Sequence, residues 1–146
     1  MEFKNNPAVY VHKPIPDYNQ LPLLFSSHDL LLIPLDFKSR FLRLSMPTKV
    51  SEYMISGTPI MVFAPKDTAL SEYALKYNWA YVIDNDDDAI RNALLDLYHN
   101  ESTRRRLGLK AKELAVSRHN ATVIRSDFKS LLSLQKKYIK EEHDDN

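Results

Sequence analysis

The sequence of 146 residues contains no cysteine and only two glycines, Gly57 and Gly108. Without cysteine there can be no disulfide, no thiol catalysis and no cysteine-ligated zinc or iron–sulfur site. Two glycines are too few to build a glycine-rich phosphate-binding loop. The five histidines are scattered and form no HExxH pattern, which argues against metallohydrolase chemistry.

Long apolar runs and a strong net charge are also missing. The longest apolar run, DLLLIPL at 29–35, is far too short to span a bilayer, and the start MEFKNNPAVY lacks the apolar segment of a signal peptide. The net charge of +1 gives no overall field that would attract nucleic acid. We therefore expect a cytoplasmic protein with no transmembrane segment and no nucleic-acid partner, a location compatible with peripheral association at the inner membrane face.

Short apolar runs alternate with segments of helical period. Strands are predicted at 8–12, 29–35, 59–64 and 80–84, and helices at 18–28, 47–56, 66–78, 87–98, 102–118 and 122–140. This alternation predicts one α/β domain over 1–146, a three-layer Rossmann-like fold with a mainly parallel sheet of about four strands and helices on both faces. We expect a core over about 8–120, a final amphipathic helix packed on it, and a frayed tail at 141–146.

A candidate site lies at the start of the helix 47–56, which follows the buried strand 29–35. In parallel sheets, ligands bind where strand carboxyl ends run into helix N-termini, and the free N–H groups there suit a phosphate. Thr48 can add a hydroxyl and Lys49 a positive charge, while Glu52 can accept hydrogen bonds from two sugar hydroxyls. Spacing alone favours a plainer interpretation, in which Lys49 and Glu52 form a surface ion pair at i, i+3.

Other charged segments are weaker candidates. Arg40 and Arg43, in the basic loop 36–45, lie at the same predicted edge. They are candidate phosphate contacts, and a solvated loop is the equally favoured alternative. The run DNDDDA at 84–89 alternates acidic residues as calcium loops do, but it lacks the required glycine and bidentate glutamate. We interpret it as the acidic cap of the next helix.

The segment MPTKVSEYMISGTPIMVFAP, residues 46–65, resembles the P-[ST]-K-x-x-E-Y-x-x-x-G-x-P-[IV] segment of family-4-like sugar-nucleotide glycosyltransferases of the GT-B fold. LPLLFSSHDLLLIPLDF (21–37) and DAIRNALLDLYHNESTRRRLGLKAKELA (88–115) resemble the flanking segments of that family, in the same order and at similar spacings. The similarity covers roughly residues 17–135. It implies a C-terminal, donor-binding domain.

The resemblance also implies roles for particular residues. Glu52 matches the glutamate that accepts hydrogen bonds from the nucleotide ribose, and Thr48 and Lys49 match the helix start beside the donor diphosphate. Many relatives carry an acid where this chain has Leu44, and a glycine-bearing loop where it has 65–68. We expect either Lys66 or the start of the following helix to provide the phosphate contact there. Neither a metal nor another cofactor is implied, and no catalytic residue is identified.

The N-terminal domain of the family, and the first βα unit of its C-terminal domain, have no counterpart in this sequence. The implied activity is sugar transfer from a nucleotide-sugar donor to a polysaccharide or lipid-linked glycan, performed together with a separate N-terminal-domain chain or as a homo-oligomer. The isolated chain is expected to be inactive. Two alternatives stay open: a non-catalytic nucleotide- or partner-binding module, and half of a sugar-nucleotide epimerase.

Overall fold

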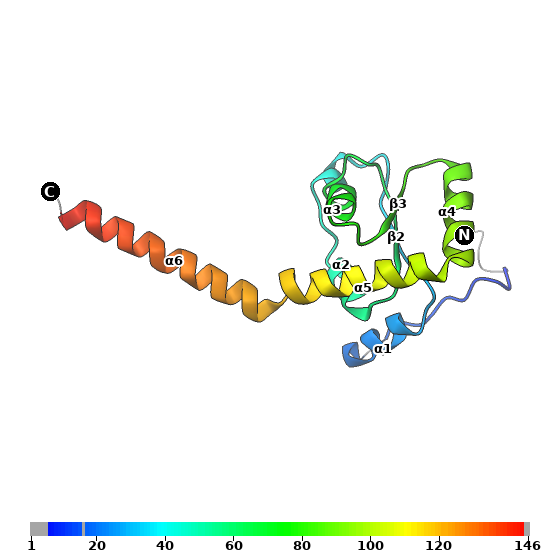
Figure 1. Ribbon diagram of the computed structural model, residues 1–146, viewed down its shortest axis with the longest axis horizontal. Coiled ribbons are helices and arrows are strands. Elements are labelled where there is room, and N and C mark those ends of the chain that lie inside the picture. Colours follow the sequence, from blue (N-terminus) through cyan, green and yellow to red (C-terminus); the bar gives the residue numbers. More distant parts are fainter. Residues whose placement is uncertain (1–5, 16, 145–146) are drawn as a thin grey trace.

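A computed structural model describes residues 6–15 and 17–144, and only the backbone of Arg40 and of residues 134–144 (Figure 1). The elements in chain order are η2 (Tyr18–Gln20), α1 (Leu21–Ser26), β1 (Leu31–Pro34), η3 (Arg40–Arg43), α2 (Lys49–Ser56), β2 (Ile60–Phe63), α3 (Ala69–Tyr77), β3 (Tyr81–Ile83), α4 (Asp87–His99), α5 (Glu101–Arg118) and α6 (Ala121–Asp144).

The strands form one parallel sheet in the order β1-β2-β3, with Leu31 opposite Ile60 and Met61 opposite Tyr81. A helix connects each strand to the next, as parallel pairing requires. The predicted α/β class with a parallel sheet is therefore confirmed. The sheet has three strands in the described part of the chain, whereas the sequence analysis predicted about four.

The segment 8–12 was wrongly predicted as a strand, because in the structure it has no regular secondary structure. Its apolar side chains lie in solvent, and Tyr10 is 80% exposed. A short apolar run forms a strand only if a neighbouring strand takes up its backbone hydrogen bonds and a core covers one of its faces. This segment has neither, and the buried residues of the described chain run from Leu31 to Ala115.

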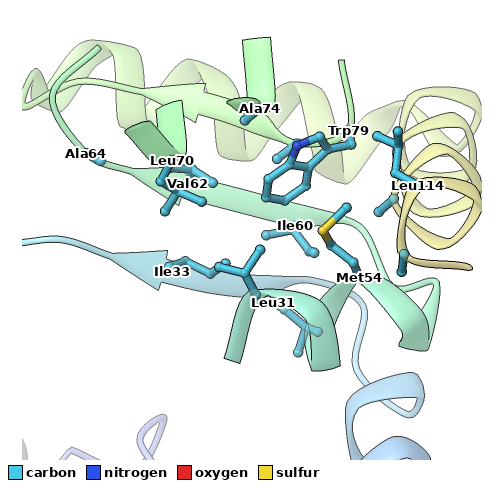
Figure 2. Close-up of a cluster of buried hydrophobic side chains, with 14 of the residues drawn as sticks. Leu31, Ile33, Met54, Ile60, Val62, Ala64, Leu70, Ala74, Trp79 and Leu114 are labelled. Carbon is cyan, nitrogen blue, oxygen red and sulfur yellow. The ribbon is translucent and has the colours of Figure 1, made fainter. Parts of the chain in front are cut away.

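Helices cover both faces of the sheet. Alternate residues of β2 point to opposite sides, so Ile60 and Val62 join one core cluster and Met61 joins the other. The larger cluster contains residues of α2, α3 and α5, and the smaller contains residues of α4 and the first half of α5. Figure 2 shows the fully buried Trp79 in the larger cluster, with its ring beside Met54, Ile60 and Leu114.

The strand β1 is an edge strand that is covered on one face only. Leu31 and Ile33 are buried against the larger cluster, but Leu32, which points to the opposite face, is 50% exposed. The outer edge of β1 pairs with no other strand in the described residues. A strand of this kind offers free backbone groups and an apolar strip to a partner.

The final helix does not pack on the domain, contrary to the prediction. Figure 1 shows α6 leaving the domain beyond the end of α5. The apolar residues of its first half are all exposed, among them Ile124, Phe128 and Leu131. The helix continues to Asp144, so residues 141–144 of the predicted frayed tail are helical, and 145–146 lie outside the described residues.

The only two glycines of the chain meet at the contact between α2 and α5. Gly57 ends α2 in the left-handed conformation, with φ at 78°. Gly108 lies in α5 directly against it, so that a Cβ atom at Gly108 would be 2.0 Å from the Gly57 carbonyl oxygen. The absence of a side chain at 108 lets the helix approach this turn.

We expect Gly108→Ala to lower the free energy of unfolding by about 1–3 kcal/mol, because the added methyl group would clash with backbone atoms that cannot move aside. At an exposed helix position the same change would raise the free energy of unfolding by about 1 kcal/mol. A decrease would therefore show that Gly108 is in close contact with the backbone of α2. Urea unfolding followed by circular dichroism measures it. Ser117→Ala, on an exposed position of α5, is the matched control; a Gly108→Ala variant as stable as this control would contradict the close contact.

Candidate functional site

Three loops meet at the carboxyl edge of the sheet. The Leu35 N–H donates to the Phe63 carbonyl oxygen (2.9 Å), and the Ala64 N–H donates to the Ile83 carbonyl oxygen (3.1 Å), so the strands leave the sheet at similar levels. The loops that follow lead into the N-termini of α2, α3 and α4. The candidate residues Arg43, Thr48, Lys49 and Lys66 all lie on the first two of these loops or directly after them.

The start of α2 is open to solvent. Thr48 occupies the N-cap position but its side chain forms no capping hydrogen bond, and both Thr48 and Lys49 are exposed. The Val50 N–H donates to the Pro47 carbonyl oxygen at 3.1 Å, which closes the first turn. A Thr48 hydroxyl that does not cap its own helix is free to bind an anion at the positive end of the helix dipole.

Lys49 and Glu52 do not form the surface ion pair that their spacing favoured. Both are exposed, and neither takes part in an ion pair or a side-chain hydrogen bond with another described residue. On α2, Glu52 lies opposite the buried Val50 and Met54, so its carboxylate faces away from the sheet. The charges of both residues are therefore available to a ligand.

Glu52 borders two hollows on the outer side of α2. One, of about 300 Å³, lies towards the end of α5 and is also lined by Val116 and His119. The other, of about 130 Å³, lies towards α1 and is also lined by Tyr18 and Leu21. The carboxylate thus stands between two recesses, each with apolar and polar walls.

Arg43 already has an anionic partner. Its guanidinium forms an ion pair with the Asp67 carboxylate, which joins the loop after β1 to the loop after β2. Both side chains are about half exposed, so the pair contributes little to stability. A phosphate would have to compete with Asp67 for Arg43, whereas Lys66 is exposed in the neighbouring turn. The side chain of Arg40 lies outside the described part of the structure.

The loop after β2 is held by a buried cap. Thr68 caps α3: its hydroxyl oxygen accepts from the Ser71 N–H at 3.2 Å, and both residues are buried. The Thr68 hydroxyl also lies 3.0 Å from the Pro65 carbonyl oxygen. In the third loop, Asp86 accepts from the N–H groups of Asp88 and Ala89, which confirms that DNDDDA caps α4.

A polar cluster near the end of α5 was missed by sequence reasoning. The Tyr73 hydroxyl lies 3.0 Å from His119 Nε2, and Arg118 stacks over the Tyr77 ring at 4.5 Å. Burial raises the pKa of Tyr73, and the nearby Arg118 charge lowers it by a smaller amount. Tyr73 and His119 are 46 residues apart in sequence, so no local motif could have predicted this contact.

Within the described residues, no three histidine or acidic side chains gather into a group that could hold a metal ion. None of the described helices combines the length and apolar composition needed to cross a bilayer. Comparison of the chain with models of protein families, with curated proteins and with solved structures finds no match.

We expect Thr68→Val to lower the free energy of unfolding by about 1–2 kcal/mol, because it removes a buried helix cap while keeping the side-chain shape. Asp67→Asn, which breaks the adjacent half-exposed ion pair, should cost less than about 1 kcal/mol. Chemical denaturation of both variants measures the difference. A larger loss for Asp67→Asn would mean that the ion pair, and not the cap, holds this loop.

Proposed function

We propose that this chain is the donor-binding domain of a glycosyltransferase and that it binds a nucleotide-sugar at the start of α2. The observation that carries the proposal is that Thr48, Lys49 and Glu52 are exposed, with no side-chain partner among the described residues, where the chain leaves the carboxyl edge of the sheet. The parallel α/β fold supports the same assignment, since ligands of such folds bind at this edge. The choice of a nucleotide-sugar as the ligand rests on the sequence resemblance to glycosyltransferases of the GT-B fold.

In this proposal the diphosphate lies at the N-terminus of α2, where the N–H groups and the helix dipole stabilise negative charge. Lys49 neutralises part of that charge, and the Thr48 hydroxyl donates a hydrogen bond. Glu52 follows after a rise of about 4.5 Å along the helix, within side-chain reach of a ribose attached to the same diphosphate. Its carboxylate accepts hydrogen bonds from the two ribose hydroxyls.

Arg43, Lys66 and Arg40 are the proposed additional phosphate contacts. Arg43 reaches the phosphate by exchanging the Asp67 carboxylate for a phosphate oxygen, a swap of one charge-assisted contact for another. Positive groups and a helix N-terminus are enough to stabilise a leaving diphosphate electrostatically. The proposal therefore requires no bound metal.

Sugar transfer itself needs a second lobe. In the described part of the chain the sheet has three strands, and the outer edge of β1, with the half-exposed Leu32, is paired with no other strand. We propose that another polypeptide segment completes the cleft there and supplies the acceptor site. Without this second segment the chain binds the donor but transfers no sugar. A non-catalytic nucleotide-binding module, the alternative interpretation, would behave in the same way.

We expect calorimetry to detect binding of UDP, GDP or one of their sugar conjugates, and we expect Glu52→Ala to weaken that binding at least tenfold, about 1.4 kcal/mol. The loss arises because the ribose hydroxyls would be left without an acceptor. Glu101→Ala is the matched control, since Glu101 is an exposed first-turn glutamate of a different helix. Absence of binding at millimolar nucleotide, in a chain that circular dichroism shows to be folded, would rule the proposal out.

Assays with a UDP-sugar also distinguish the glycosyltransferase proposal from the epimerase alternative and from a nucleotide site elsewhere. Conversion of a UDP-sugar without any acceptor would identify an epimerase half, and equal binding by native chain and Glu52→Ala would place the nucleotide elsewhere on the molecule. Lys49→Ala should act on phosphate recognition, so it should weaken binding of the diphosphate more than binding of the nucleoside.

A further inference from the structure

We propose that two copies of this chain associate through α6, antiparallel about a two-fold axis between Val123 and Ile124, so that each α6 lies along the other copy's α5. This inference concerns a different surface from the start of α2 and does not depend on the nucleotide. It accounts for exposed side chains on two helices that the isolated fold leaves in solvent.

The first observation is the apolar stripe of α6. Five apolar side chains in its first three turns are between 41% and 64% exposed: Val123, Ile124, Phe128, Leu131 and Leu132. Ile124, Phe128, Leu131 and Leu132 recur at spacings of three and four residues and therefore share one side of the helix, and Val123 directly precedes Ile124. Figure 1 shows no other element of the domain alongside this helix. A contiguous apolar stripe of this kind marks an interaction surface.

The second observation is that the outer side of α5 carries a matching surface. Leu109 is 62% and Val116 is 53% exposed, and they lie two turns apart on the side opposite the buried Ala111. Beside Leu109, an open groove of about 550 Å³ separates α5 from the end of α3 and is lined by Tyr77, Arg105 and Arg106. A helix laid along this face would cover the two exposed aliphatic residues.

The register follows from the positions of these residues. An antiparallel pair with its axis between 123 and 124 brings together residues whose numbers sum to 247. The resulting apolar and aromatic pairs are Val123 with Ile124, Val116 with Leu131 and His119 with Phe128. Because a two-fold interface is self-complementary, each pair occurs twice. The break between α5 and α6, at His119 and Asn120, lies about one turn from the axis.

Charge supports the same register. It places Glu141 and Glu142, near the end of α6, opposite Arg106 and Arg105. Both arginines are exposed and form no hydrogen bond or ion pair with the described side chains, unlike Arg104, which donates to the Leu97 and Tyr98 carbonyl oxygens. In this register, two acidic positions of each copy face two basic positions of the other. Their attraction fixes the register more than it adds affinity.

Two like-charge pairs occur in this arrangement, and each has a partner within its own domain. Lys110, opposite Lys137, is already bound to Glu113 at 3.0 Å. Arg118, opposite Lys129, stacks on the Tyr77 ring and so points inward. The unfavourable charges are therefore engaged before the two copies meet, whereas Arg105 and Arg106 are not.

Sedimentation equilibrium of the full chain tests the association. We expect a dimer whose dissociation constant rises at least tenfold, about 1.4 kcal/mol, in Leu131→Glu, because a carboxylate would be buried against the partner's Val116. Ser126→Glu places the same charge on the opposite, exposed side of α6 and should leave the dimer unchanged. A native chain that is monomeric at every concentration, including one that folds α6 back on its own α5, would overturn the proposal.

Charge reversal tests the register. Arg105→Glu with Arg106→Glu should weaken the dimer by about tenfold at low salt, and adding Glu141→Arg with Glu142→Arg should restore it. Restoration requires the two segments to face each other. A dimer that is indifferent to the first pair of changes, or that the second pair fails to rescue, would contradict this arrangement.

The absence of cysteine allows a direct test of direction. Ile124→Cys places one thiol beside the axis, next to its copy, and should form an interchain disulfide on mild oxidation. Leu131→Cys should not, because its copy lies fifteen positions along the helix, about 22 Å away. An efficient cross-link through Leu131→Cys would show a parallel pair, and failure of Ile124→Cys to cross-link would show a different interface.

Discussion

The contact between Gly57 and Gly108 is the constraint on which the rest of the domain depends. It places α5 against the turn that ends α2, and among the described residues α5 is the one helix that contributes to both core clusters. Ala111, Leu114 and Ala115 then reach the larger cluster, while Leu107 reaches the smaller one. A helix held farther out by a side chain at 108 would loosen both clusters at once. Glycine at 108 allows α5 to approach the end of α2 closely, and both glycines of the chain lie at this one contact.

The larger elements could be predicted because their signals are local. Continuous apolar runs marked the three strands of the sheet, and helical periodicity marked the helix α2 between two of them. The predictions that were wrong depended on neighbouring elements, which the sequence alone does not identify. The segment 8–12 has the composition of a strand but no neighbour, and the stripe of α6 indicates a buried helix but does not say against what it is buried. Periodicity identifies a face to be covered; the covering surface is a tertiary or quaternary property.

The candidate site shows the same division. The sequence predicted that Thr48, Lys49 and Glu52 would stand together at the start of a helix, because three residues within one turn cannot be far apart. It could not predict that Lys49 and Glu52 would stay unpaired, that Arg43 would bind Asp67 across two loops, or that Tyr73 would meet His119. These outcomes depend on side-chain directions set by the packing of elements distant in sequence.

The two proposed surfaces meet at Glu52. The hollow between Glu52 and α5 is also lined by Val116, which in the paired arrangement would contact the partner's Leu131. The hollow on the other side of Glu52, towards Tyr18 and Leu21, would stay open. A ribose bound between Glu52 and α1 and a partner helix bound between Glu52 and α5 would then lie on opposite sides of the Glu52 carboxylate. Because linkage is reciprocal, any effect of pairing on nucleotide affinity must appear equally as an effect of nucleotide on pairing. The direction of that coupling depends on whether the partner helix holds the Glu52 side chain in the conformation that the ribose requires.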